Sequence, residues 1–155
     1  SRGLGDVYKR QEKVDGPSHL KVVEEFGYEM YMHCGAIRKV LLAWQTPAFI
    51  DEYFKNIILH DQAFPHVRPD DLREELKKIR QDGYAITHGE YVTDALGIGA
   101  PVFNSDGELA GSIGIIAPEI RVDTPEFLDT QKDLVQFYAS SLSADLGYEK
   151  HDVFQ

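Results

Sequence analysis

The chain has 155 residues, of which 43% are hydrophobic and 27% are charged, as in an ordinary soluble globular domain. Its single cysteine, Cys34, excludes an intrachain disulfide, and the net charge of −10 argues against direct binding of nucleic acid. No apolar run approaches the roughly 18 residues of a membrane span. These features predict one domain in a reducing cytoplasm, without contact to membrane.

The two ends of the chain show no helix or strand periodicity. Residues 1–11 resemble a translated sequencing tail, so we exclude them from the fold. Residues 148–155 follow Gly147 and have the character of a C-terminal tail. We therefore assign the folded domain to residues 12–147, and we expect it to be entered from an upstream segment.

Two strands and two helices are expected first. The segment HLKVVEE alternates apolar and charged residues, and FGYEMYMH is expected to form a second strand that ends near His33. A helix then runs from Gly35 to about Trp44. Thr46 and Pro47 mark the start of the next helix, because a threonine hydroxyl caps a helix and proline fits its first turn.

The segment DDLREELKKIRQDG gives the clearest helical pattern in the chain. Leu72, Leu76 and Ile79 form an apolar stripe, and Gly83 fits the position after the last helical residue. The remaining positions carry similar numbers of acids and bases. We expect them to form a solvated face with ion pairs between neighbouring turns.

The second half is expected to form strands and a last helix. A short strand, YAI, precedes ALGIGAPVF and ELAGSIGIIA, which flank the hairpin signal NSDG. Thr124 and Pro125 begin a helix that reaches about Leu146. Helices packed on an antiparallel sheet make an α+β domain. Four residues of the last helix are expected to point inward: Phe127, Leu134, Tyr138 and Leu142.

One face of the hairpin consists almost entirely of small residues. A four-residue loop places Gly97 opposite Gly114, whereas a two-residue loop shifts the partners by two and keeps the same face. Glycine in a strand marks a place where a helix or a ligand comes close, and both remain open here. The face comprises Ala95, Gly97, Gly99, Ser112, Gly114 and Ile116. The opposite face carries Ile98, Val102, Leu109, Ile113 and Ile115.

Several segments, in this order, carry a family resemblance: GAIRKVLLAW, LREELKKIRQDGYAITHGE, IGAPVFNSDGELAGSIGIIAPEIRV and the last helix. Over residues 12–147 the chain resembles the effector-binding domain of IclR-type transcriptional regulators. The resemblance implies a GAF-like antiparallel sheet flanked by helices, and homodimers or tetramers. It also implies a winged helix-turn-helix domain on the N-terminal side, absent from this chain, through which operator DNA would be bound.

The resemblance further implies a small organic acid as effector, with its carboxylate on the backbone of Ala36 and Ile37. The other implied ligand positions are Met30, Thr87, Ala95, Gly97, Gly114 and Ile116, with Arg38 and His88 as additional candidates. Arg38 either pairs with the acid or points to solvent, and we expect solvent because long basic side chains extend outward.

The chain departs from the family pattern at several of these positions. The family's keto-acid pockets have serines at the positions of Gly114 and Ile116 and an acid at that of Thr87. Without these polar groups, the pocket is expected to suit an aromatic or sugar-derived acid.

Other functional classes have less support in the sequence. Cys34 precedes a helix N-terminus, where a thiol can be activated, but no histidine is spaced to serve as its base. We therefore expect a small buried residue there. No histidine pair has zinc-site spacing, so we expect no metal, cofactor or catalytic residue. The main expectation is an effector sensor, and the alternatives are a pure oligomerisation module or a GAF-like enzyme acting on a small acid.

Overall fold

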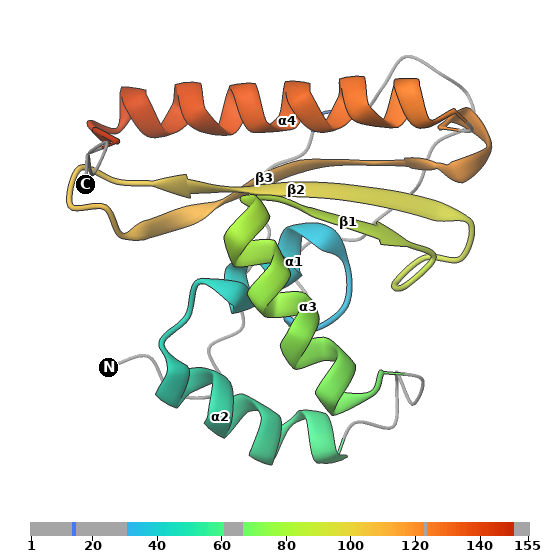
Figure 1. Ribbon diagram of the computed structural model, residues 1–155, viewed down its shortest axis with the longest axis vertical. Coiled ribbons are helices and arrows are strands. Elements are labelled where there is room, and N and C mark those ends of the chain that lie inside the picture. The colour runs from blue at the N-terminus through green and yellow to red at the C-terminus, as the bar shows by residue number, and fades with distance from the viewer. Residues whose placement is uncertain (1–13, 15–30, 61–66, 123, 151–155) are drawn as a thin grey trace.

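The computed structural model describes residue 14 and residues 31–60, 67–122 and 124–150 (Figure 1). The strand predicted at residues 19–25 and most of the following one lie outside this part of the chain. Met32 and His33 are described and form a turn, so the prediction of a strand up to His33 is wrong at its end.

The helices before the sheet begin and end close to the predicted residues. Helix α1 spans Ala36–Ala43, and α2 spans Pro47–Asn56, with the hydroxyl of Thr46 accepting a hydrogen bond from the amide of Phe49 at 3.2 Å. A short 3-10 helix, η1, spans Ile58–His60. Helix α3 spans Pro69–Asp82 and ends at Gly83, whose φ of 78° is the left-handed conformation expected of a C-terminal glycine.

Within the described residues, three antiparallel strands form a sheet in the order β1-β2-β3. They span Ala85–His88, Ala95–Phe103 and Leu109–Pro118, and a 3-10 helix, η2, follows at Glu119–Arg121. Helix α4, Pro125–Asp145, covers one face of the sheet, and α1 packs on the other face with α3 and α2 beyond it (Figure 1). The predicted α+β class is therefore confirmed.

The hairpin between β2 and β3 has a different register near its loop than along most of its length. The amide of Asn104 donates to the carbonyl oxygen of Glu108, so three residues form the loop. Val102 pairs with Gly111 and Phe103 with Leu109, which leaves Ala110 as the extra residue of a β-bulge. Beyond the bulge the register equals the one expected for a two-residue loop.

The bulge also explains a misplaced residue. Ile98, Val102, Ile113 and Ile115 pack on the α4 side, as predicted, whereas Leu109 packs against the cluster on the α1 side. Leu109 lies between the loop and the extra residue of β3, so its side chain reaches the face opposite to that of Ile113 and Ile115.

The inward face of α4 differs from the predicted one. Val135, Ala139 and Ser143 are buried against the sheet, and the hydroxyl of Ser143 accepts from the amide of Phe103 at 3.0 Å. The predicted inward residues Phe127, Leu134, Tyr138 and Leu142 are exposed instead. Among the described residues, no helix combines the length and the apolar character needed to cross a bilayer.

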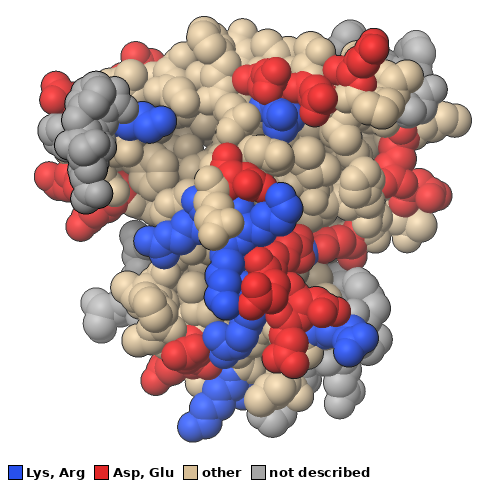
Figure 2. Space-filling model, in the orientation of Figure 1, with Lys and Arg blue, Asp and Glu red and all other residues tan. Residues whose placement is uncertain are grey.

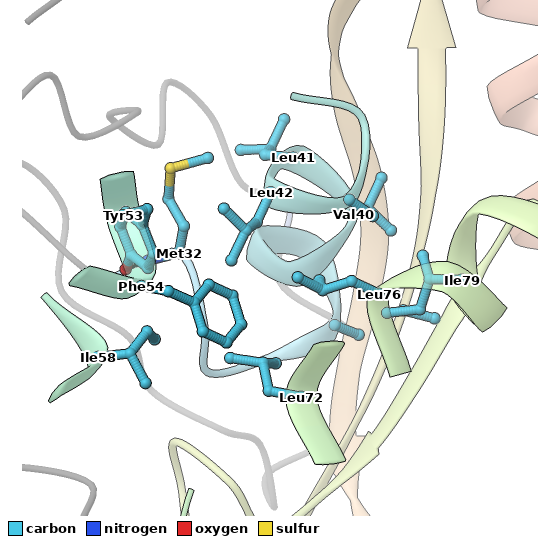
Figure 3. Packing of buried hydrophobic residues seen from close by; sticks show 13 residues of the cluster. Met32, Val40, Leu41, Leu42, Tyr53, Phe54, Ile58, Leu72, Leu76 and Ile79 are labelled. Atoms are coloured by element: carbon cyan, nitrogen blue, oxygen red, sulfur yellow. Dashed lines mark hydrogen bonds between the residues drawn. The ribbon is translucent and has the colours of Figure 1, made fainter. Parts of the chain in front are cut away.

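The main core lies between α1, α2 and α3 (Figure 3). Val40 and Leu42 of α1 have no exposed surface, and they meet Phe54 of α2 and the predicted stripe of α3. That stripe, Leu72, Leu76 and Ile79, is confirmed as buried. A second core of aliphatic residues joins the sheet to α4. The start of α1 is thus held between the main core and the sheet.

The charged residues of α3 face solvent (Figure 2). Lys78 pairs with Asp82 at 2.6 Å, and Lys77 pairs with Glu74 at 2.8 Å. The pairing with Asp82 raises the pKa of the Lys78 ammonium. The prediction of a solvated face with ion pairs between turns is confirmed.

Candidate functional site

The N-terminus of α1 lies on the small-residue face of the sheet. Gly35 precedes the helix with a φ of 91°, a conformation that glycine adopts without strain. Its amide donates to Oε2 of Glu90 at 3.1 Å, and the amide of Ala36 donates to Oγ1 of Thr87 at 3.1 Å. The helix start is therefore capped by a strand residue and a loop residue that are distant in the sequence.

Three glycines allow this close approach. A Cβ atom added at Gly99 would lie 2.9 Å from both N and Cα of Ile37, and one added at Gly97 would lie 2.9 Å from Oγ1 of Thr87. A Cβ atom added at Gly114 would lie 2.7 Å from Cγ1 of Ile37. The sequence left two explanations open for these glycines, the close approach of a helix or of a ligand. In the described residues, helix α1 lies against them.

Most of the predicted ligand residues share this face. The strand pairing aligns Thr87, Gly97 and Ile116 in one row and Ala85, Gly99 and Gly114 in the next. Ala36 and Ile37 lie over these rows at the start of α1. Ala95 is paired with Pro118, two residues before Gly97 on the same face. Met30 lies outside the described residues.

Two further residues belong to this contact and were not among the predicted ligand positions. Gly99 lies beneath the backbone of Ile37, and the hydroxyl of Ser112 donates to the carbonyl oxygen of Ile37 at 2.8 Å. Both belong to the small-residue face that the alternation of the strands had defined. The sequence therefore contained the signal for them.

Arg38 does not point to solvent as expected. Its guanidinium carbon lies 4.0 Å from the centre of the Tyr91 ring, and Nη1 donates to the carbonyl oxygen of Cys34 at 3.1 Å. Burial lowers the pKa of this guanidinium, and electrostatic contacts with Tyr91 and Cys34 act in the opposite direction. Folding back over the first turn gives one donor a backbone carbonyl partner and stacks the cation on an aromatic ring.

His88 is separated from the site. It follows Thr87 in β1, and successive strand residues point to opposite faces, so its side chain lies on the other side of the sheet. There Nδ1 lies 2.7 Å from Oε1 of Glu119. His88 therefore does not face the start of α1, and its role as an additional ligand residue stays a prediction.

A buried lysine was missed by the sequence reasoning. Lys39 of α1 is 2% exposed, and its Nζ lies 2.8 Å from each carboxylate oxygen of Glu75 and also contacts Oε1 of Glu90. The signal was its helical spacing, because Lys39 lies three residues after Ala36 and four before Ala43, both buried. A lysine on an inward face needs acidic partners.

The residues just before α1 are buried and tightly bonded. Cys34 is 1% exposed, which confirms the prediction of a small buried residue. The hydroxyl of Tyr53 accepts from the amide of Met32 at 2.8 Å and lies 2.8 Å from Nδ1 of His33. These bonds fix the chain that leads into Gly35.

Within the described ranges, no group of three or more histidine, cysteine, aspartate or glutamate side chains could hold a metal ion.

The described part of the chain contains a pocket of about 150 Å³ between α3 and the loop after β1. Its lining residues are Lys39, Val67, Arg68, Asp71, Leu72, Glu75 and Glu90.

Comparison with known proteins identifies the domain. Residues 11–144 match the profile of the family described as "Bacterial transcriptional regulator IclR C-terminal". The chain belongs to this IclR family. The predicted limits of the folded domain, 12–147, remain a prediction.

Relatives in the IclR family are similar over most of this chain. It is 30% identical over 139 residues to an uncharacterized HTH-type transcriptional regulator, RhmR, of Escherichia coli. The matched region covers 88% of this chain and 53% of that protein. The regulator KdgR of Dickeya chrysanthemi is 28% identical over 148 residues, or 90% and 45% of the two chains. This chain therefore spans about half the length of these relatives.

A solved structure agrees with the family assignment. The crystal structure of the IclR protein of Thermotoga maritima has a TM-score of 0.77 at 28% identity, over 88% of this chain and 56% of that one. The proteins found in these comparisons are described as transcriptional regulators. The expectation of a regulatory domain rather than an enzyme is thus confirmed for the family.

Proposed function

We propose that this domain is an effector sensor that binds the carboxylate of a small organic acid at the start of α1. In the full-length protein, binding changes the operator affinity of an N-terminal winged helix-turn-helix domain. That protein is proposed to act in the cytoplasm as a homodimer or tetramer.

The hydrogen bond between the amide of Ala36 and the hydroxyl of Thr87 carries this proposal. The first amides of a helix attract anions, because they lack partners within the helix and lie at the positive end of its dipole. At Ala36 this position is filled by a neutral hydroxyl from a neighbouring strand. A carboxylate makes a stronger hydrogen bond to the same amide, so it can replace Thr87 there.

The surrounding side chains support a preference for an apolar acid. Gly97 lies next to Ala36, Ile116 pairs with Gly97, and Gly114 lies next to Ile37; none of the three has a side-chain donor. Serine hydroxyls at the positions of Gly114 and Ile116 would favour a small keto acid, whereas their absence favours an aromatic ring or the carbon chain of a sugar acid.

Removal of one amide hydrogen tests the proposed site. Thr87→Ala frees the amide of Ala36, and we expect it to bind benzoate or gluconate at least as well as the wild type does. Thr87→Ala combined with Ala36→Pro lacks that amide hydrogen, while proline remains compatible with the first helical position. We expect at least about tenfold weaker binding in this double variant, since a hydrogen bond to a charged group contributes roughly 1.5–3 kcal/mol.

Calorimetric titration of both variants measures the difference, with circular dichroism to show that the helix content is equal. Equal affinity of the two variants would exclude the Ala36 amide from the site. Binding of glyoxylate or pyruvate, with none of benzoate or gluconate, would leave the site in place and overturn the preference for a larger acid.

A further inference from the structure

The start of α1 already carries a carboxylate of the protein itself. Oε2 of Glu90 accepts from the amide of Gly35, one residue before the amide that we propose for the effector. A second carboxylate placed on Ala36 would therefore lie next to Glu90. Two like charges this close repel each other, and the repulsion is stronger where the site is shielded from water.

Glu90 has a second partner that keeps it in place. Its other oxygen, Oε1, contacts Nζ of Lys39, and Lys39 is held in turn by both oxygens of Glu75 on α3. The carboxylate of Glu90 can therefore leave the amide of Gly35 and remain paired with a buried cation. Such a movement loses one hydrogen bond but leaves no charge unpaired.

The surroundings provide room for this movement. The pocket of about 150 Å³ is lined by Glu90 and Lys39 on one side and by α3 on the other. The loop that carries Glu90 is bounded by Gly89 and Asp94, both with positive φ, and Tyr91 of this loop contacts Arg38 of α1. The loop thus touches the first turn of α1 through two adjacent side chains.

We propose that Glu90 determines how strongly the start of α1 selects anions, by occupying the Gly35 amide in the ligand-free domain and releasing it when an acid binds, while its contact with Lys39 is kept. Glu90 is then a specificity-determining residue of the effector site. This inference rests on the proposed function, since it requires an acid at α1.

The test compares charged and neutral probes of the same shape. Benzoate and benzamide, and pyruvate and pyruvamide, are titrated into the wild type, Glu90→Gln and Glu119→Gln. Glu119→Gln is the matched control, because it removes the same charge from a residue that pairs with His88 on the other face of the sheet. Thermal unfolding of each variant establishes that it is folded.

We expect Glu90→Gln to bind the acids about tenfold more tightly than the wild type and to bind the neutral amides unchanged. Glu119→Gln should match the wild type for both. A merely structural role of Glu90 would weaken the binding of acid and amide alike. That result, or unchanged acid affinity in Glu90→Gln, would overturn the inference while leaving the proposed site intact.

Absence of acid binding in the wild type together with tight binding in Glu90→Gln supports the inference, because Glu90 then blocks the site completely. If none of the three proteins binds an acid, both this inference and the proposed function are wrong. The outcomes therefore separate the role of Glu90 from the existence of the site.

Discussion

Gly114→Ala is expected to lower the free energy of unfolding by about 3 kcal/mol, because overpacking of a rigid contact typically costs 1–3 kcal/mol and sometimes more. The added Cβ would lie too close to the carbonyl oxygen of Ile98 and 2.7 Å from Cγ1 of Ile37. Backbone surrounds it on the sheet side, since the Cα of Gly99 would be 3.0 Å away. To make room for the added Cβ, either the sheet or α1 would have to shift, and each is packed against the other.

Gly111→Ala is the matched control, because it makes the same change in the same strand where, chain neighbours aside, no atom of the described residues lies within 4 Å of the added Cβ. We expect it to be neutral or to stabilise by about 0.5 kcal/mol, since alanine loses less backbone entropy than glycine on folding. Thermal unfolding measures both variants. Equal melting temperatures for the two would show that α1 does not rest on Gly114.

Lys39→Met is expected to destabilise the domain by about 2–4 kcal/mol, close to the usual cost of removing one partner from a buried ion pair. Methionine nearly preserves the volume of the side chain, so cavity formation contributes little. The loss arises because Glu75 and Glu90 would face each other without the cation that both contact. Their partial exposure allows water to reduce this cost.

Lys77→Met provides the comparison for a lysine at the surface. Lys77 pairs with Glu74, and both side chains are largely exposed, so the change should alter stability by less than about 0.5 kcal/mol. Urea unfolding monitored by circular dichroism gives the free energies. A loss for Lys39→Met as small as that for Lys77→Met would contradict the role of Lys39 as the link between α1, α3 and the loop.

Much of the candidate site could be predicted from the alternation of side chains along the strands. Gly97 and Gly114 were placed on one face without knowledge of the register, because a shift by two residues leaves the face unchanged. Helix boundaries were also predictable, since Thr46 and Thr124 each accept a hydrogen bond from the amide three residues later. Local chemistry was sufficient in these cases.

Other features depend on contacts that a single sequence does not reveal. Helix α4 has large apolar residues on its outward side, whereas the smaller residues Val135 and Ala139 pack against aliphatic side chains of the sheet. A rule that places the largest apolar residues inward therefore selects the wrong side. Likewise, the capping of α1 by Thr87 and Glu90 joins residues more than fifty positions apart.

In the proposed site, the amide of Ala36 exchanges the hydroxyl of Thr87 for an effector carboxylate. A crystal structure of the domain with the acid that raises its melting temperature most tests this directly. We predict a carboxylate oxygen within about 3 Å of the Ala36 nitrogen, with the Thr87 hydroxyl turned away. An acid bound elsewhere, with the bond between Ala36 and Thr87 intact, would contradict the claim.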